Sequence, residues 1–183
     1  MAFPAFLDTC VLFGQQVTDL LLHLALRGCF VPYWSHDVLD EMERSVAGMG
    51  RTTADAVHSR RVRMEAAFPE AMVSGYEALI GDMTNHPGDR HVLAACVRSS
   101  AHTLVTFNLK DFPAAALSPY DIEAKHPDAF VLDQLDLHPL WSRAAVEAML
   151  RKNRLPPHDV GALAERLRAA GLPGSAQAIE TWI

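Results

Sequence analysis

A short apolar run that ends in polar residues limits the fold more than any other feature of the chain. Residues 104–113 read LVTFNLKDFP, a pattern typical of a buried strand that ends before a proline. Thr106, Asn108 and Asp111 follow the apolar start of this run. If the strand belongs to an open parallel sheet, these residues lie at the sheet edge where α/β folds bind their ligands.

Similar apolar runs alternate with helix-like segments as far as Pro119. The strand-like runs are residues 3–8, 30–34, 71–74 and 103–106. The helix-like segments are residues 15–27, 36–46, 52–67 and 89–97. This alternation predicts a parallel sheet with right-handed crossovers and helices on both faces. We therefore expect an α/β fold with three layers, α/β/α.

The pattern changes after Pro119, where strand-like runs give way to helix-like segments separated by proline or glycine. These segments are residues 121–124, 129–135, 142–151, 159–169 and 175–183. We predict an α/β domain at residues 1–118 and an all-helical C-terminal extension at residues 119–183.

The composition favours a compact soluble protein. Of the 183 residues, 50% are hydrophobic and 21% are charged, which is enough for one core and a small addition. No apolar run approaches the ~20 residues that a membrane-spanning helix requires. The first residues also lack the basic and small-residue features of a signal peptide. We expect a cytoplasmic protein without membrane association.

The cysteines do not suggest a disulfide framework. Cys10, Cys29 and Cys96 lie in apolar sequence and form no C-x-x-C pair, so we interpret them as small core residues. A catalytic thiol at Cys10 is disfavoured because no histidine is near it in sequence.

The net charge of −6 by itself disfavours a nucleic-acid partner, although a carboxylate metal site would add to the acidic count. Two groups of basic residues could contact phosphates: Arg44, Arg51, Arg60, Arg61 and Arg63, and then Arg151, Lys152 and Arg154. For each group alone, a solvated helix face is the simpler interpretation.

Four acidic residues can be placed around the same edge of the predicted sheet. Asp8 ends the first apolar run, Glu41 lies in a helix-like segment, Asp89 begins another helix, and Asp111 follows the last strand. Four converging carboxylates would repel each other unless a divalent cation lay between them. We therefore predict a metal site.

Each of these acids also has a simpler explanation. Asp8 could close a turn, Glu41 could be a solvated helix residue like its neighbours Asp40 and Glu43, and Asp89 could favour the positive end of a helix dipole. Asp111 could cap a turn. We prefer the metal site because the simpler explanation must hold independently at all four positions.

The ordered set of motifs resembles the PIN domain, and in particular the VapC-like toxins of bacterial toxin–antitoxin pairs. The motifs are Asp8 after a strand, VLDE at 38–41, GDRHVLAA at 88–95 and TFNLKD at 106–111. Together they extend over about residues 3–118. The helical C-terminal residues are similar to an extension of some longer members.

The resemblance implies an endoribonuclease that uses Mg²⁺ or Mn²⁺ to hydrolyse RNA, with a small antitoxin as partner and a homodimer as a further expectation. The implied metal-binding and catalytic residues are Asp8, Glu41, Asp89 and Asp111, and the implied polar strand-end positions are Thr106 and Asn108. Many members carry Asp where this chain has Asn108, which leaves the number of metal ions open.

Two other functions remain open from the sequence. A metal-dependent phosphatase on a flavodoxin-like sheet would usually have Asp-x-Asp at the first strand, whereas Asp8 is followed by Thr9 and Cys10. A non-catalytic RNA- or protein-binding module with a degenerate acidic site is the second. Four histidines lie nearest the predicted site, His36, His86, His91 and His102, but no spacing among them suggests zinc. His91 could contact substrate, although a packed or surface role is favoured for it.

Overall fold

The structure is a computed structural model that describes residues 2–50, 52–152 and 157–182. Arg51 and Arg154 of the two basic groups, and Ile183 at the end of the last expected helix, lie outside the described residues. Within the described residues, no helix is long and apolar enough to cross a membrane.

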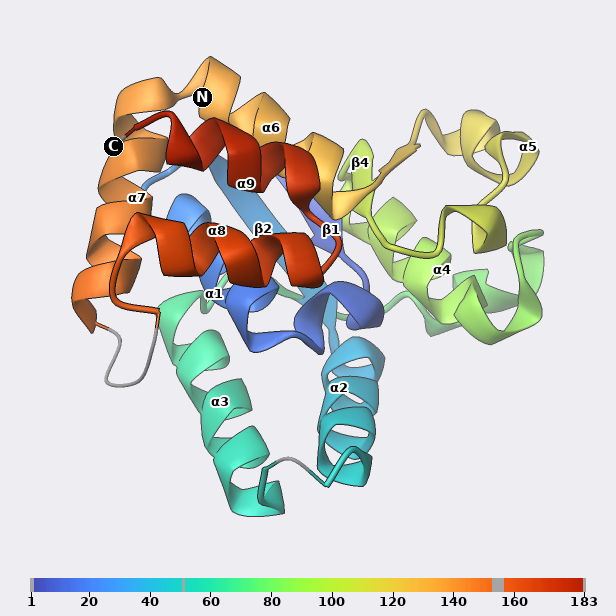
Figure 1. Ribbon diagram of the computed structural model, residues 1–183. Coiled ribbons are helices and arrows are strands. Elements are labelled where there is room, and N and C mark those ends of the chain that lie inside the picture. Colours follow the sequence, from blue (N-terminus) through green and yellow to red (C-terminus); the bar gives the residue numbers. More distant parts are fainter. Residues whose placement is uncertain (1, 51, 153–156, 183) are drawn as a thin grey trace. The chain divides into compact units, whose positions relative to one another are not determined.

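The described strands form one five-stranded sheet in the order β3-β2-β1-β4-β5 (Figure 1). Their bounds are Phe3–Leu7 for β1, Phe30–Ser35 for β2, Met72–Val73 for β3, Thr103–Val105 for β4 and Glu123–Lys125 for β5. The strands pair in parallel, because helices carry the chain back between them. The predicted α/β class with a central parallel sheet and a helical C-terminal region is confirmed.

Helices follow the strands in the expected order. The first ones are α1 (Gln15–Leu26), α2 (His36–Gly48), α3 (Ala54–Ala67), α4 (Arg90–Ser99) and the short α5 (Ala114–Leu117). Ser35 caps α2, since its hydroxyl accepts the N–H of Val38 at 3.3 Å. Short 3₁₀ turns lie between these elements, at η1 (Thr9–Leu12), η2 (Glu77–Asp82), η3 (Pro87–Asp89), η4 (Leu109–Asp111) and η5 (Ser118–Tyr120).

The described residues of the C-terminal region form four helices, whereas the helix expected at residues 121–124 is absent. Its helices are α6 (Pro127–Leu137), α7 (Pro139–Lys152), α8 (Val160–Ala169) and α9 (Pro173–Glu180). Residues 121–124 do not form the expected helix. Asp121 has a left-handed backbone, and the following residues pair with β4 as an edge strand, where the N–H of Glu123 donates to His102 at 2.9 Å. An edge position tolerates the charged side chains of this segment.

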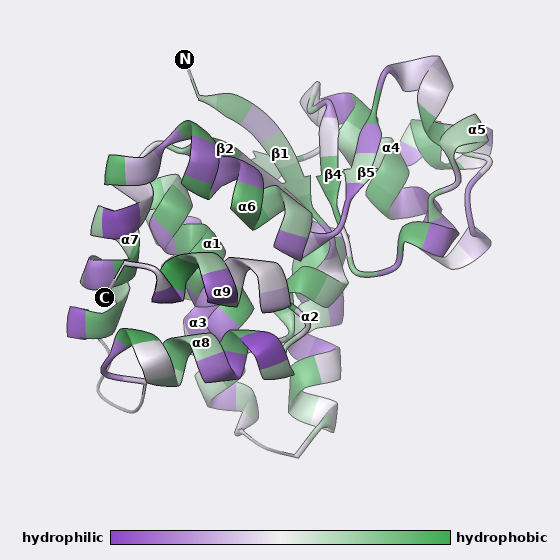
Figure 2. Cartoon of the chain, turned by 45° about the horizontal axis from the view of Figure 1, so that its top comes forward, coloured by the Kyte–Doolittle hydropathy of each residue, from purple (hydrophilic) through white to green (hydrophobic). Residues whose placement is uncertain are grey.

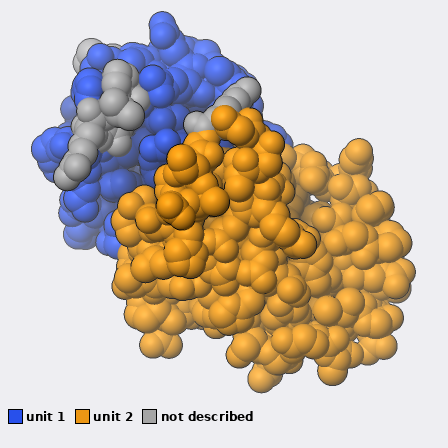
Figure 3. Space-filling view, turned by 90° about the horizontal axis from the view of Figure 1, so that it is seen from below, with its two compact units in different colours: residues 1–3, 14–31, 126–183 blue, residues 4–13, 32–125 orange. Residues whose placement is uncertain are grey.

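The chain divides into two compact units (Figure 3). Unit 1 consists of residues 1–3, 14–31 and 126–183, and unit 2 of residues 4–13 and 32–125. The helix α1 therefore groups with the C-terminal helices. The predicted domain boundary between residues 118 and 119 concerns independent folding, and it stays a prediction.

The core of unit 1 is built by amphipathic helices. Packing contacts join α1 to α7 and α8, α6 to α7 and α9, and α8 to α9. The ring of Phe130 meets Phe3 and Phe30 edge to face, with centroids 6.1 and 4.9 Å apart. The hydropathy colours of Figure 2 show these helices carrying green and purple residues side by side, as expected of elements that bury one face.

The core of unit 2 lies on the sheet. Phe6, Trp34 and Leu104 are fully buried strand residues, and the Trp34 ring meets Phe68 edge to face at 5.9 Å. The parallel register is Leu7 opposite Val105 and Ser35 opposite Val73. The carboxyl ends of the strands consequently lie at one edge of the sheet.

We predict that Asp128 stabilises α9 from outside that helix. Its carboxylate accepts the N–H groups of Gly174 and Ser175 at 2.9 and 2.7 Å, so it caps the first turn of α9 from α6. Asp128→Ala should lower the free energy of unfolding by about 1–2 kcal/mol. Urea unfolding followed by circular dichroism measures the change. Asp136→Ala, at an exposed position of the same helix, is the control, and equal losses in the two variants would contradict the capping role.

Candidate metal centre

The first pair of predicted residues leaves the sheet together. Beyond the pair Leu7 and Val105, the N–H of Asp8 donates to the carbonyl of Val105 at 3.1 Å. The hydroxyl of Thr106 then donates to Oδ2 of Asp8 at 2.6 Å. Both side chains are buried, Asp8 with only 3% of its surface exposed. The strand ends thus fix Asp8 and Thr106 against each other.

The two oxygens of Asp8 have different partners. Oδ1 accepts the N–H of Thr9 at 2.6 Å and so caps the turn η1. Oδ2 accepts the Thr106 hydroxyl and the Cys10 thiol, the latter at 3.0 Å. The turn-closing role expected as the simpler explanation is therefore real, and it occupies one oxygen only.

Cys10 lies in this site, where the sequence suggested a small core residue. Its sulfur accepts the N–H of Phe107 at 3.2 Å and lies 3.4 Å from the Thr106 hydroxyl. Burial, and then the charge of Asp8, raise the pKa of the thiol to about 12. The thiol therefore stays protonated and serves as a hydrogen-bond donor to Asp8. Its position two residues after Asp8 was the only signal in the sequence.

Glu41 reaches the same region from α2. Its Oε2 accepts the Thr9 hydroxyl at 2.8 Å, and its Oε1 lies 3.5 Å from Nε2 of His91 on α4. The contact with His91, followed by the hydrogen bond from Thr9, holds the pKa of Glu41 below its usual value against the effect of burial. Thr9 thus links Glu41 to the turn that Asp8 begins.

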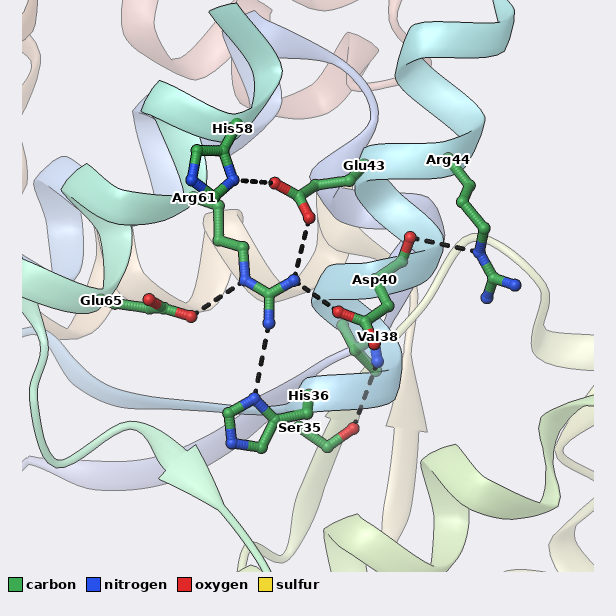
Figure 4. A network of polar contacts seen from close by, with 9 residues as sticks. All are labelled: Ser35, His36, Val38, Asp40, Glu43, Arg44, His58, Arg61 and Glu65. Atoms are coloured by element: carbon green, nitrogen blue, oxygen red, sulfur yellow. Dashed lines mark hydrogen bonds and ion pairs between the residues drawn. The ribbon is translucent and has the colours of Figure 1, made fainter. Parts of the chain in front are cut away.

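The acidic neighbours of Glu41 point elsewhere (Figure 4). Asp40 and Glu43 both pair with the guanidinium of Arg61 on α3, Glu43 at 2.9 Å. Arg61 also bonds Glu65 at 3.0 Å. The helical period of α2 places Glu41 on another face than these two acids. Arg61, a member of the first basic group, thus pairs with carboxylates of the chain itself.

Asp89 and Asp111 form a group with a histidine. His86, Asp89 and Asp111 each offer one ligand atom, and these atoms all lie within 4.8 Å of one another. Nδ1 of His86 is 3.1 Å from Oδ2 of Asp89, and the backbone N–H of His86 donates to the carbonyl of Asp111 at 3.1 Å. Asp89 stands at the N-cap position of α4, yet its side chain makes no capping hydrogen bond. A capping hydrogen bond therefore does not account for its orientation, while its position at the start of α4 still favours a negative charge.

Burial and neighbouring charges shift the pKa values of these residues. Burial raises the pKa of Asp89, and the charge of Asp111 raises it further. Burial also raises the pKa of Asp8, against its three hydrogen bonds, and the charge of Asp89 adds to the increase. For His91, burial acts to lower the pKa, but contact with Glu41 outweighs it and the pKa is raised.

The structure thus groups the six predicted residues unequally. Asp8 and Thr106 are hydrogen-bonded, Asp89 and Asp111 lie in the group with His86, and Glu41 is connected through Thr9. Asn108 contributes through its backbone N–H, which donates to Thr106 at 2.9 Å, while the residue itself is exposed. All six belong to unit 2.

These donors suit a divalent ion. Carboxylate oxygens are the ligands that Mg²⁺ and Mn²⁺ prefer, and both ions are compatible with a site that keeps several waters. A cation here would stabilise the charged forms of Asp8 and Asp89, whose pKa values are raised by burial first and then by the charge of an acidic neighbour. The donor set therefore fits the metal that the sequence predicts.

We predict a pH dependence of stability that is specific to Asp8. Because folding raises the pKa of Asp8 above 3.8, the metal-free protein should lose stability as pH rises from about 4 through the folded-state pKa. Asp8→Asn should remove this part of the loss. Thermal unfolding between pH 4 and 7 in EDTA measures it, with exposed Asp55→Asn as control. Parallel stability profiles for wild type and Asp8→Asn would refute the prediction.

We also predict that the Cys10 thiol is unreactive at neutral pH. With a pKa of about 12, its thiolate is scarce, so alkylation by iodoacetamide at pH 8 should be at least about tenfold slower in folded than in unfolded protein. Mass spectrometry of the Cys10 peptide measures the rate. Rapid labelling of Cys10 in the folded protein would show that its thiol ionises freely.

Known proteins match this chain in its sequence. Residues 127–181 match the model of the family described as the VapC50 C-terminal domain. Over 97 residues the chain is 48% identical to the protein named "Putative ribonuclease VapC50" of Mycobacterium tuberculosis. The matched segment spans 53% of this chain and 57% of that relative, little more than half of either. No solved structure matches the chain. In these two matches, its ordered acidic motifs and its parallel sheet, the chain is similar to the VapC-like proteins.

Proposed function

We propose that the protein is a divalent-metal-dependent endoribonuclease that hydrolyses RNA phosphodiester bonds. One observation supports the proposal above the others: Asp8, bonded to Thr106 beyond the paired ends of β1 and β4, has a pKa that is raised by burial and further by the charge of Asp89, which forms a group with Asp111. The similarity to a relative named as a ribonuclease supports the same reaction.

Asp89, Asp111 and Asp8 are the residues that would hold the ion, directly or through water, with Glu41 positioning water. A bound Mg²⁺ or Mn²⁺ would supply activated water for in-line attack and charge stabilisation at the leaving oxygen. The arrangement needs no protein nucleophile, in agreement with the protonated thiol of Cys10.

Hydrogen bonds in the chain prepare these carboxylates before substrate arrives. Thr106 and Cys10 donate to Oδ2 of Asp8, and Thr9 donates to Oε2 of Glu41. Such contacts fix the direction of the remaining lone pairs, which is what preorganisation of a site requires. His91 lies beside Glu41 and its pKa is raised, and in its protonated form it would offer positive charge to a phosphate of the substrate.

We further propose that the protein is the toxin of a type II toxin–antitoxin pair, with a small antitoxin protein as partner and a homodimer as its assembly. The family supports this role, and the matched relative carries the VapC name. The region matched by the C-terminal family model, which includes α6 to α9, then belongs to the toxin itself.

We predict that RNA cleavage depends on Asp8 and Asp89. Each residue is replaced by Asn, and Glu41 by Gln, which removes charge with little change in shape. Cleavage of single-stranded or structured RNA in Mg²⁺ or Mn²⁺ should fall by about 100-fold or more in each variant. Gel analysis of RNA fragments measures the rate.

Asp40→Asn is the matched control, because Asp40 neighbours Glu41 and bonds Arg61 at an exposed position. Exposed ion pairs contribute little, so its rate should remain within about threefold of wild type. Wild-type rates in Asp8→Asn would end the proposal. Hydrolysis of p-nitrophenyl phosphate without RNA cleavage would indicate a phosphatase. No activity, with Mg²⁺ affinity unchanged by Asp8→Asn or Asp89→Asn, would indicate a binding module.

A further inference from the structure

We propose that His86 supplies a nitrogen ligand to the divalent ion of this site, so that the site selects a transition-metal ion such as Mn²⁺ over Mg²⁺. The inference rests on the proposed function only in that an ion binds beside Asp89 and Asp111. It adds a residue from outside the four acids and gives the site a preference that carboxylates alone would not impose.

The backbone places His86 for this role. His86 begins the turn η3, and the N–H of Asp89 donates to its carbonyl at 2.9 Å. Its own N–H bonds the carbonyl of Asp111 at 3.1 Å, which ties η3 to η4. Two separate turns therefore present their side chains to the same point.

The distances suit a shared ion. The ligand atoms of His86, Asp89 and Asp111 lie within 4.8 Å of one another. Ligands at about 2.0–2.2 Å from one ion are separated by at most about 4.4 Å, when they lie on opposite sides of it. Small side-chain rotations would bring all three atoms within that limit.

Nδ1 of His86 can make only one of its two close contacts as a hydrogen bond. Nδ1 lies 3.3 Å from the N–H of Gly88, as an acceptor, and 3.1 Å from the carboxylate of Asp89. A single ring nitrogen cannot accept from Gly88 and donate to Asp89 at once. A cation bound by both Nδ1 and the carboxylate would replace the 3.3 Å contact with Gly88 and make ligands of two facing acceptors.

Gly88 leaves room for the imidazole in this position. A Cβ at residue 88 would lie 3.3 Å from Nδ1 and 3.4 Å from Cε1 of His86, tighter than ordinary contacts. The glycine therefore permits the ring to lie over η3, and Gly88→Ala would displace the ring without removing its nitrogen.

The donor set determines the preference. Mg²⁺ prefers oxygen ligands in near-octahedral geometry, whereas imidazole nitrogen favours transition metals. Mn²⁺ accepts carboxylates as Mg²⁺ does and gains more from an added nitrogen. A site of two carboxylates and one imidazole should therefore bind Mn²⁺ at least about tenfold more tightly than Mg²⁺.

The test uses the full chain and Mn²⁺ alone. Electron paramagnetic resonance of free Mn²⁺ gives its affinity, and competition with Mg²⁺ gives the second affinity. His86→Ala should weaken Mn²⁺ binding by about tenfold or more while Mg²⁺ binding changes by less than about threefold. Electron spin echo modulation from ¹⁴N should be present in wild type and lost in His86→Ala.

Two further variants keep the outcome decisive. Gly88→Ala should weaken Mn²⁺ binding and its nitrogen signal, since the ring is displaced. His58→Ala removes another exposed histidine, which pairs with Glu43, and should change neither. Wild-type protein without a nitrogen signal, without Mn²⁺ binding, or with equal weakening of both ions in His86→Ala would overturn the inference. The proposed function fails separately, through RNA cleavage that does not depend on Asp8.

Discussion

The hydrogen bond from Thr106 to Asp8 is the contact on which the rest of the site depends. It exists because β1 and β4 pair in parallel and end at the same level, so the residues after Leu7 and Val105 leave the sheet as neighbours. A one-residue slip would turn Asp8 toward the opposite face of the sheet. The register of two short buried strands therefore sets the position of a charge that contributes nothing to the core.

Burying the charged carboxylate of Asp8 costs free energy, and its hydrogen-bond donors offset only part of that cost. Three donors from Thr9, Cys10 and Thr106 solvate Asp8, yet its pKa remains raised. The pKa of Asp89 is also raised, although its side chain is only half-buried. A fold optimised only for stability would avoid two such carboxylates, because burial and like charge both disfavour their charged forms. Their presence agrees with the proposed site for a positive ion.

The sequence predicted the parallel sheet and most of the helices, because strand length and helical period are local properties. The assignment of the four acids to a metal site stays a prediction. The sequence interpreted Cys10 as a core residue and gave His86 no role in the site, because their contacts join separate turns that no periodicity describes. It assigned residues 121–124 to a helix because edge pairing with β4 is a tertiary effect. It also left Glu41 undecided against its neighbours, since only the position of Arg61 on α3 separates them.

The attachment of α3 has a consequence for α2. Of the residues in α3, only Val57 and Met64 are buried, and the remaining contacts with α2 include the ion pairs of Arg61. Partly exposed ion pairs are screened by dissolved salt, whereas apolar packing is not. The ion pairs that hold α3 against α2, the helix that carries Glu41, therefore weaken in concentrated electrolyte. The position of Asp8 depends on strand pairing and is insensitive to salt.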